Sequence, residues 1–172
     1  ISKLLPLHVF GEGKITLNQQ IGKILTEQNA TLGTVESCTG GEISKEIVQI
    51  SGSSVYFNGS IVSYSNDLKI NLVGVNPISI KNHGAVSEQV VTEMAINGRK
   101  LLNVDYCIAT SGIAGPSGGT KEKPVGTIWI CIAGPNAIQA KKFNFGDDRA
   151  RNIKITYLTG LNMLRQMLLK IN

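Results

Sequence analysis

The chain has 172 residues, which is the length of one ordinary domain and is enough to bury a core without disulfide or metal support. Its hydrophobic fraction of 42% excludes an intrinsically disordered protein, and its 19 glycines exceed average usage, which indicates many turns or a close approach of backbone to a ligand. The 17 basic and 12 acidic residues give a net charge of +5 with no block of five like charges, which suits a small anionic ligand better than a nucleic-acid duplex.

The cysteines and the termini indicate a cellular setting. The chain has three cysteines, Cys38, Cys107 and Cys131, and no CxxC pair. The odd number and the wide spacing argue against a disulfide framework or a zinc site and favour the reducing cytosol. No apolar stretch reaches 18 residues and no signal peptide is visible, so we expect a cytoplasmic protein without membrane association. Because Ile1 is not an initiator methionine, we expect residues 1–14 to be a lead-in from a linker to a missing N-terminal domain.

The first half of the chain alternates helical and extended patterns. Apolar residues recur at helical spacing after residue 16, and the β-prone segment that follows runs into a glycine-rich turn. In chain order, the pattern predicts a helix over 16–29, a strand over 31–35, a helix over 41–50, a strand over 59–63 and a helix from Asn66 through Leu72.

The second half continues this alternation and ends with a hairpin and a long helix. Ser87 is placed to cap a helix whose apolar face extends to Leu102, and Gly134-Pro135-Asn136 separates two extended segments. Strands that alternate with helices predict one domain, residues 1–172, with a three-layer α/β/α fold and a mixed, mostly parallel sheet. In chain order, we expect a helix from Ser87, a strand over 106–110, a loop over 111–124, hairpin strands over 125–133 and 137–145, and a helix over 149–171.

The first informative loop, Glu36-Ser37-Cys38-Thr39-Gly40-Gly41, follows a strand and opens a helix. The N–H groups of such a turn point outward, and the helix N-terminus carries partial positive charge. A serine there has oxyanion donors beside it, as in strand-to-helix nucleophile turns, but Ser and Thr are also the usual helix caps. These residues alone leave capping and catalysis open for Ser37. We expect the thiol of Cys38 to point into the fold.

The second loop, residues 110–120, follows another predicted strand and holds four glycines and four hydroxyl residues. In an open α/β sheet, ligands bind beyond the carboxyl ends of the strands, and such a loop can wrap a phosphate or ribose with its backbone. The loop is neither a Walker loop nor a GxGxxG turn before a helix. Its alternative interpretation is a flexible surface loop.

A serine nucleophile needs a base, and neither histidine is well placed to be one. His83 lies in a predicted turn and His8 in the lead-in, so we expect both to be structural, and no spacing suits a metal. A lysine can serve instead, as in known Ser–Lys variants. Lys69 follows the strand end at Tyr64 and is separated from Ser37 by one helix and one strand, so the two can meet at one sheet edge. The alternative is an ordinary solvated lysine.

Several motifs in a fixed order resemble one known family. Together they are similar to the C-terminal domain of the competence/damage-inducible protein CinA, and the resemblance extends from Leu17 to Leu169. Stand-alone versions of that domain are nicotinamide-nucleotide amidohydrolases. The resemblance implies hydrolysis of nicotinamide mononucleotide to nicotinate mononucleotide and ammonia without a cofactor or a metal, and it favours catalysis at Ser37. The motifs are ESCTGG (36–41), YSNDLK (64–69), HGAVSE (83–88), SGIAGPSGG (111–119) and KPVGT (123–127).

Carried over residue by residue, the resemblance makes Ser37 the nucleophile, Lys69 the general base and Tyr64 an assisting residue. The family's phosphate-side arginine follows a Gly-x-Arg pattern, whereas this chain reads GDDRAR from Gly146 and has one extra residue before the first arginine. We expect Arg149 to contact the anion, with Arg151 as the second choice and ordinary first-turn roles as the alternative. The implied substrate-binding residues are Thr39, Gly40, Gly41, Asn66, Thr110, Ser111, Gly112, Gly115 and Arg149.

Two rival functions stay open at this point. The glycine loops also fit a non-catalytic nucleotide-binding module of a larger CinA-type protein, and the charge of +5 with the family's competence label suggests a DNA-associated protein. We expect a phosphorylated nucleotide as the partner and no nucleic acid. A homodimer is expected from the apolar stripe of the last helix, which is otherwise core: Tyr157, Leu161, Leu164, Leu168 and Ile171.

Overall fold

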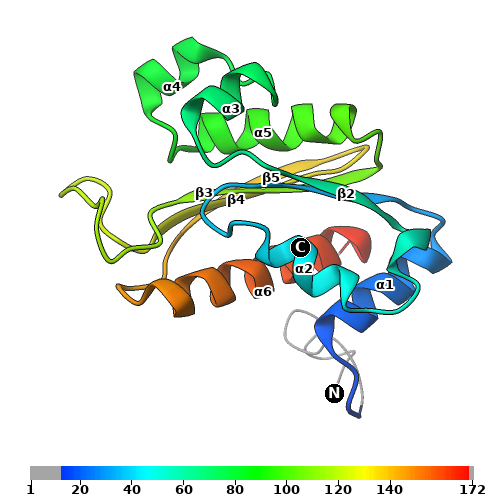
Figure 1. Ribbon diagram of the computed structural model, residues 1–172. Coiled ribbons are helices and arrows are strands. Elements are labelled where there is room, and N and C mark those ends of the chain that lie inside the picture. The colour runs from blue at the N-terminus through cyan, green and yellow to red at the C-terminus, as the bar shows by residue number, and fades with distance from the viewer. Residues whose placement is uncertain (1–12, 171–172) are drawn as a thin grey trace.

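A sheet of five strands separates two layers of helices in the protein, for which a computed structural model describes residues 13–170 (Figure 1). The elements are α1 (Leu17–Glu27), β1 (Leu32–Glu36), α2 (Glu42–Val48), the 3-10 turn η1 (Ser53–Val55), β2 (Phe57–Val62), α3 (Asn66–Asn71), α4 (Pro77–His83), α5 (Glu88–Leu101), β3 (Tyr106–Gly112), β4 (Thr127–Ala133), β5 (Ile138–Asn144) and α6 (Arg149–Leu168).

The sheet has the strand order β2-β1-β3-β4-β5. The strands β2, β1 and β3 are parallel, whereas β4 is antiparallel to both β3 and β5, so four of the five strands point the same way. Glu36, the last residue of β1, pairs with Val62 of β2 and Thr110 of β3. The carboxyl ends of three neighbouring strands therefore meet at one edge. The expectation of an α/β fold with a mixed, mostly parallel sheet is confirmed.

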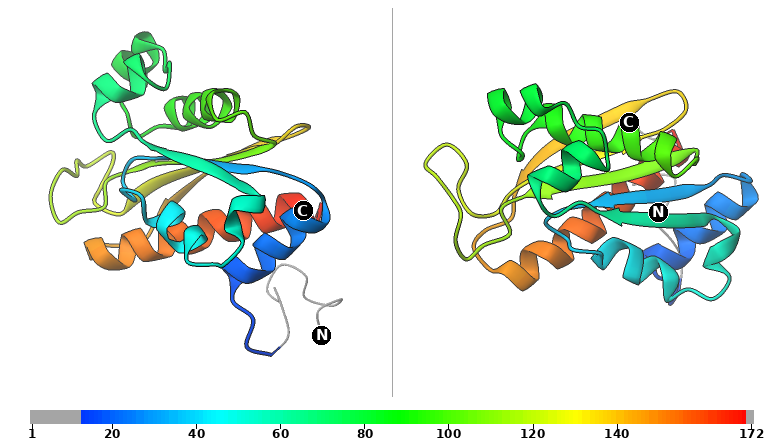
Figure 2. Two further views of the ribbon diagram at one scale, coloured as in Figure 1. Left: turned by 45° about the vertical axis from the view of Figure 1, so that its right-hand side comes forward. Right: turned by 45° about the horizontal axis from the view of Figure 1, so that its top comes forward.

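Two helical layers cover the faces of the sheet. The helices α1, α2 and α6 lie on one face, and α5 lies on the other with α3 and α4 beside it (Figures 1 and 2). Every residue of β1 is buried, as expected for a central strand that is covered on both faces. Successive residues of β3 serve opposite cores: Ile108 packs with the α1/α2/α6 layer and Ala109 with the α5 layer. Gly98 of α5 lets this helix approach Val35.

The predicted elements are present, and one further helix is found. The helix α4 was not expected, although Asn76 caps it and Pro77 takes its first position, which is a readable start signal. The turn predicted at His83 is the C-terminal end of this helix, where Gly84 has a φ of 74°. The strand β3 continues to Gly112, two residues into the segment that was predicted to be loop.

The apolar stripe of the last helix serves the core. Leu161, Leu164 and Leu168 are buried against the sheet and α1, and Tyr157 is partly buried beside them. Ile171 lies outside the described residues. The homodimer therefore stays a prediction, because the leucines that suggested it are used within the subunit. The lead-in predicted for residues 1–14 also lies outside the described part, apart from its last two residues.

The three cysteines lie inside the fold. All three are free and buried. Burial raises the pKa of the Cys38 thiol to about 12, so this group is protonated at neutral pH. Between residues 13 and 170, no helix combines the length and the apolar character that crossing a membrane requires.

Candidate active site

The glycine-rich turn after β1 begins at the carboxyl edge of the sheet. The N–H of Ser37 donates to the carbonyl oxygen of Thr110 at 3.1 Å, so the first residue of the turn is still held by β3. The N–H of Gly40 then donates to the carbonyl oxygen of Ser37 at 3.1 Å, which closes the turn. Gly40 and Gly41 have φ values of 63° and 100°, a region that favours glycine. The chain thereby reverses into α2 and leaves Ser37 at the sheet edge.

Lys69 lies directly beside Ser37. Its Nζ is 3.0 Å from the Ser37 Oγ, 2.8 Å from the carbonyl oxygen of Ser63 and 3.3 Å from that of Tyr64. The lysine is placed there because α3 follows β2 after only three residues and begins with a cap in which Ser65 accepts the N–H of Leu68. The structure thus joins the two residues that the sequence separates by one helix and one strand.

Burial defines the electrostatics of this pair. The exposed fraction is 2% for Lys69 and 8% for Ser37. Loss of hydration lowers the pKa of the Lys69 ammonium, and the nearby Cys38 acts in the opposite direction to a smaller extent. The alternative in which Lys69 is an ordinary solvated helix residue is therefore wrong. The neutral amine, which can accept a proton, is favoured at a lower pH than in water.

The alternative in which Ser37 caps α2 is also wrong. The cap residue is Gly41, which has no side chain, and the carboxylate of Glu36 accepts the N–H groups at the start of the helix. The remaining N–H of the first turn, that of Glu42, donates to the carbonyl oxygen of Thr39 at 3.1 Å. The Ser37 hydroxyl is left to Lys69.

A cavity of about 220 Å³ opens beside the serine–lysine pair. Seven of the residues proposed from the sequence line it, and they come from four separate segments of the chain. Two further residues that line the cavity, Ala85 and Val86, were not proposed from the sequence. They belong to the HGAVSE motif, which supported the family resemblance but was given no role in the site. The lining consists of Ser37, Cys38, Tyr64, Asn66, Lys69, Ala85, Val86, Ser111, Gly112, Ala114 and Arg149.

Arg149 contributes a positive charge to the cavity. Its guanidinium donates to the carbonyl oxygen of Gly115 at 2.9 Å and to the hydroxyl of Tyr64 at 3.1 Å. Asp148 caps α6 by accepting the N–H of Arg151 at 2.7 Å, so Arg149 becomes the first helical residue. Arg151 does not line the cavity. One arginine of the GDDRAR segment therefore lies at the site, even though the segment has one residue more than the Gly-x-Arg pattern.

Five of the proposed substrate-binding residues do not line the cavity. Thr39 and Thr110 are buried, and their hydroxyl oxygens lie 2.9 Å apart. The N–H of Gly40 and that of Gly41 are already used within the turn, and Gly115 offers its carbonyl oxygen to Arg149. Their predicted contacts with a ligand stay predictions.

The segment between α4 and α5 forms one wall of the cavity and is fastened at two points. The Ser111 hydroxyl donates to the carbonyl oxygen of Ala85 at 2.7 Å, and Lys123 Nζ donates to that of His83 at 2.6 Å. The side chain of His83 is exposed and outside the cavity, in line with the structural role expected for it. His8 lies outside the described residues.

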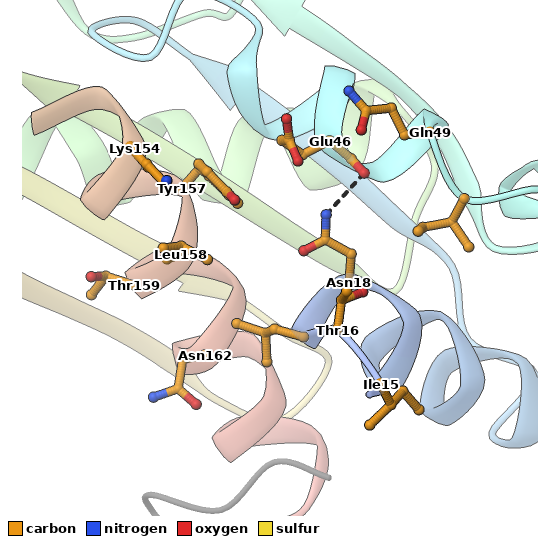
Figure 3. A pocket seen from close by; sticks show the side chains of 12 residues that line it. Ile15, Thr16, Asn18, Glu46, Gln49, Lys154, Tyr157, Leu158, Thr159 and Asn162 are labelled. Carbon is orange, nitrogen blue, oxygen red and sulfur yellow. Dashed lines mark hydrogen bonds between the residues drawn. The ribbon is translucent and has the colours of Figure 1, made fainter. Parts of the chain in front are cut away.

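A larger hollow of about 830 Å³ lies elsewhere, between α1, α2 and α6 (Figure 3). Asn18 donates to the carbonyl oxygen of Glu46 at 3.0 Å there, and Lys154 and Tyr157 line its other side. None of the catalytic or substrate-binding residues proposed from the sequence belongs to it. Size favours this hollow, but the buried lysine and serine favour the smaller cavity as the reactive site. Within residues 13–170, no three His, Cys, Asp or Glu side chains lie close enough to hold a metal ion.

The fold and the site together define a class: a single α/β domain with a buried serine–lysine pair at the carboxyl edge of its parallel strands. The chain belongs to the CinA family, because the model of the CinA C-terminal domain matches residues 14–168. The resemblance noted from the motifs is thereby confirmed.

Relatives and solved structures agree with this assignment. The chain is 48% identical over 164 residues to a CinA-like protein from Prochlorococcus marinus (strain MIT 9515), covering 94% of this chain and 38% of that protein. It is 42% identical over 170 residues to a CinA-like protein from Desulfosudis oleivorans, covering 98% of this chain and 41% of that protein. The chain thus spans about two fifths of the length of these relatives.

Two crystal structures share the fold closely. The competence/damage inducible protein CihA from Agrobacterium tumefaciens has a TM-score of 0.85 at 34% identity, covering 87% of this chain and 92% of that one. A CinA superfamily protein from Klebsiella pneumoniae has a TM-score of 0.86 at 28% identity, covering 90% of this chain and 96% of that one.

Proposed function

We propose that this domain is an amidohydrolase that converts nicotinamide mononucleotide to nicotinate mononucleotide and ammonia through a Ser37–Lys69 dyad. The observation that carries the proposal is the 3.0 Å contact between Lys69 Nζ and Ser37 Oγ, with both side chains buried beside a cavity. A nucleophile and a base within hydrogen-bond reach are the minimum equipment for acyl transfer. The substrate follows from the resemblance to stand-alone CinA domains.

In the first step, neutral Lys69 takes the proton of the Ser37 hydroxyl while Oγ attacks the carboxamide carbon. The lowered pKa of Lys69 supports this step, because it increases the fraction of neutral amine near pH 7. The carbonyl oxygens of Ser63 and Tyr64 hold Nζ in place. No further base is needed.

The tetrahedral intermediate carries a negative oxygen that needs N–H donors. The N–H group of Cys38 fits this role, since Cys38 lines the cavity and no oxygen atom of the described residues accepts this N–H. The residue after the nucleophile supplies such a donor in other strand-to-helix turns. When the C–N bond breaks, the Lys69 ammonium returns its proton to the nitrogen, and ammonia leaves.

Hydrolysis of the acyl-enzyme repeats the same chemistry with water. Lys69 removes a proton from the water as its oxygen attacks the acyl carbon, and it then protonates Ser37 Oγ as the ester bond breaks. The product is the pyridine carboxylic acid, which releases its proton to water at neutral pH, and the serine is intact. One water is consumed for each ammonia released, and no oxidant or reductant takes part.

Binding is proposed to depend on Arg149 and Tyr64. The cavity of about 220 Å³ is smaller than the range of about 300–1,000 Å³ typical of pockets that enclose a whole ligand. We therefore place the carboxamide ring inside and the phosphate at Arg149, whose guanidinium can form charge-assisted hydrogen bonds with it. Asn66, Ser111 and Gly112 also line the cavity.

The proposed setting is the cytoplasm, with the nucleotide as the ligand and neither nucleic acid nor membrane as a partner. Three free, buried thiols are compatible with a reducing compartment. We retain the homodimer as part of this proposal. We also retain the expectation that no cofactor and no metal are needed.

The deciding experiment measures ammonia release from nicotinamide mononucleotide, with and without a chelator. The wild-type protein should release ammonia in both cases. Ser37→Ala should lower kcat by roughly a thousandfold or more, and the control Ser54→Ala, which removes an exposed hydroxyl outside the cavity, should not change it. Nucleotide binding without ammonia release by wild type would instead establish the non-catalytic module. Near-normal turnover in Ser37→Ala would refute the nucleophile assignment.

A further inference from the structure

Glu36 is a buried acid that the proposed reaction does not use. It ends β1, immediately before Ser37, and its exposed fraction is 0%. A buried carboxylate needs hydrogen-bond partners, since loss of hydration is otherwise costly. Five N–H and hydroxyl groups lie within hydrogen-bond distance of the Glu36 oxygens, and no lysine or arginine is among them.

The partners of Glu36 come from two directions. Its Oε2 accepts the N–H of Gly41 at 3.0 Å and that of Ile43 at 3.1 Å. Its Oε1 accepts the N–H of Ser44 at 2.9 Å. The hydroxyls of Thr34 and Ser60 lie 3.2 Å and 3.5 Å from Oε1. Their oxygens are also 2.7 Å apart, so one hydroxyl donates to the other and only the remaining proton is donated to Oε1. The carboxylate therefore joins β1, β2 and the start of α2.

This arrangement replaces an ordinary helix cap. A cap residue normally satisfies the first free N–H groups with its own side chain, but Gly41 has none. Glu36 reaches from five residues upstream and accepts the N–H of the cap residue together with those of the second and third helical residues. Because these groups are occupied, a substrate anion cannot use them.

We propose that Glu36 is a positioning residue for Ser37, an inference that rests on the proposed function. The turn 37–41 is held at one end by the strand and at the other by the Glu36 carboxylate. Between these ends, the Ser37 hydroxyl is free of capping and faces Lys69 at 3.0 Å. If the Glu36 carboxylate loses an acceptor oxygen, the buried N–H groups that it accepts are left without a partner, and the turn shifts to satisfy them. Ser37 then moves away from Lys69.

Glu36→Gln tests this inference with the smallest change in shape. A glutamine has one acceptor oxygen, and its amide nitrogen donates, so either Ser44 or the Gly41 and Ile43 pair faces another donor. We expect kcat on nicotinamide mononucleotide to fall by roughly 10- to 100-fold, as a displacement of about 1 Å in a catalytic group produces. KM should change little, because Glu36 does not line the cavity. The pH dependence should keep its midpoint, which Lys69 sets.

The matched control is Glu42→Gln, which removes a negative charge from the first turn of the same helix. The Glu42 side chain pairs with Lys45 at the surface and does not touch the turn, so kcat should stay at the wild-type value. Should Glu36→Gln fail to fold, Thr34→Val removes one of the two hydroxyls beside the carboxylate and keeps the side-chain shape. That variant should show a smaller fall in kcat, again without a change in KM.

A second readout does not depend on turnover. Crystal structures of wild type and Glu36→Gln give the Ser37 Oγ to Lys69 Nζ distance, which should lengthen in the variant. The inference would be overturned if folded Glu36→Gln protein had the kcat of wild type, or if its Ser37 Oγ to Lys69 Nζ distance were unchanged. If wild type releases no ammonia but the distance still lengthens in the variant, the proposed function fails and the positioning role of Glu36 stands.

Discussion

The guanidinium of Arg149 donates to the hydroxyl of Tyr64 at 3.1 Å, although 85 positions separate the two residues in the chain. Tyr64 also offers its backbone carbonyl oxygen to Lys69 Nζ at 3.3 Å. One residue thus contacts both the proposed base and the proposed anion-binding arginine. The position of Tyr64 fits an assisting role in the same site, as the motif YSNDLK implied.

Arg149→Lys should weaken phosphate recognition. A lysine keeps the positive charge but loses the planar guanidinium that can bind the phosphate and still contact Gly115. We expect KM for nicotinamide mononucleotide to rise by roughly tenfold or more, since a hydrogen bond to a charged group contributes about 1.5–3 kcal/mol. Steady-state kinetics test this. Arg151→Lys is the control and should keep the wild-type KM, and an equal effect of both changes would contradict the assignment.

Lys69→Met should abolish activity while leaving the protein folded. Methionine fills a similar volume without a charge that must be buried, so the free energy of unfolding near pH 7 should be equal to or above that of wild type. Ammonia release and thermal unfolding provide the two measurements. A folded Lys69→Met variant with substantial turnover would show that another group is the base.

The lowered pKa of Lys69 sets the direction of two pH effects. Lys69 has a lowered pKa in the folded protein and its ordinary pKa of 10.5 in the unfolded chain. Between these two pKa values, the unfolded chain therefore binds more protons than the folded protein. The free energy of unfolding of wild type relative to Lys69→Met should therefore rise with pH in that window and level off above 10.5. Activity should rise with pH up to the lowered pKa of folded Lys69, as the amine becomes neutral, and level off above it. A kcat/KM that does not fall below that pKa would argue against Lys69 as the base.

Cys38→Ala should retain activity, although Cys38 is adjacent to the nucleophile. The thiol is buried and its pKa is raised to about 12, so it supplies almost no thiolate at neutral pH. We expect kcat within a few-fold of wild type and slow alkylation of the native protein by iodoacetamide. Turnover assays and mass spectrometry give the answer. Loss of ammonia release in Cys38→Ala but not in Ser37→Ala would indicate a thiol mechanism.

Gly98→Ala should destabilise the fold without touching the cavity. An added Cβ at this position meets Val35 and the Cys107 sulfur, because α5 packs closely on the sheet there. Overpacking of this kind costs about 1–3 kcal/mol, which denaturant unfolding can measure. The exposed Lys100→Ala on the same helix is the control. A Gly98→Ala protein as stable as wild type would mean that the helix moves away from the sheet at little cost.

Much of the fold is predictable from the sequence because its signals are local. Helical spacing between residues 16 and 29, the serine cap at Ser87 and the Gly-Pro-Asn hairpin turn each depend on neighbours within a few positions. Helix α4 was missed although its Asn-Pro start is equally local. The last helix shows the limit of this reasoning. Its leucine stripe indicated either core or interface, and only packing against the sheet placed it in the core.

The sequence by itself determined the α/β class, the family and the two loops that carry the candidate chemistry, since motifs and periodicity are properties of short segments. Tertiary structure decided the rest. Whether Ser37 caps a helix or faces a base depends on Glu36, which caps α2 in its place, and on Lys69, which the parallel pairing of β1 and β2 brings to it. The choice of Arg149 over Arg151 depends on where Asp148 begins α6. The contacts of Lys69 with Ser37 and of Arg149 with Tyr64 join distant segments, and burial, which lowers the pKa of Lys69, exists only once those segments meet.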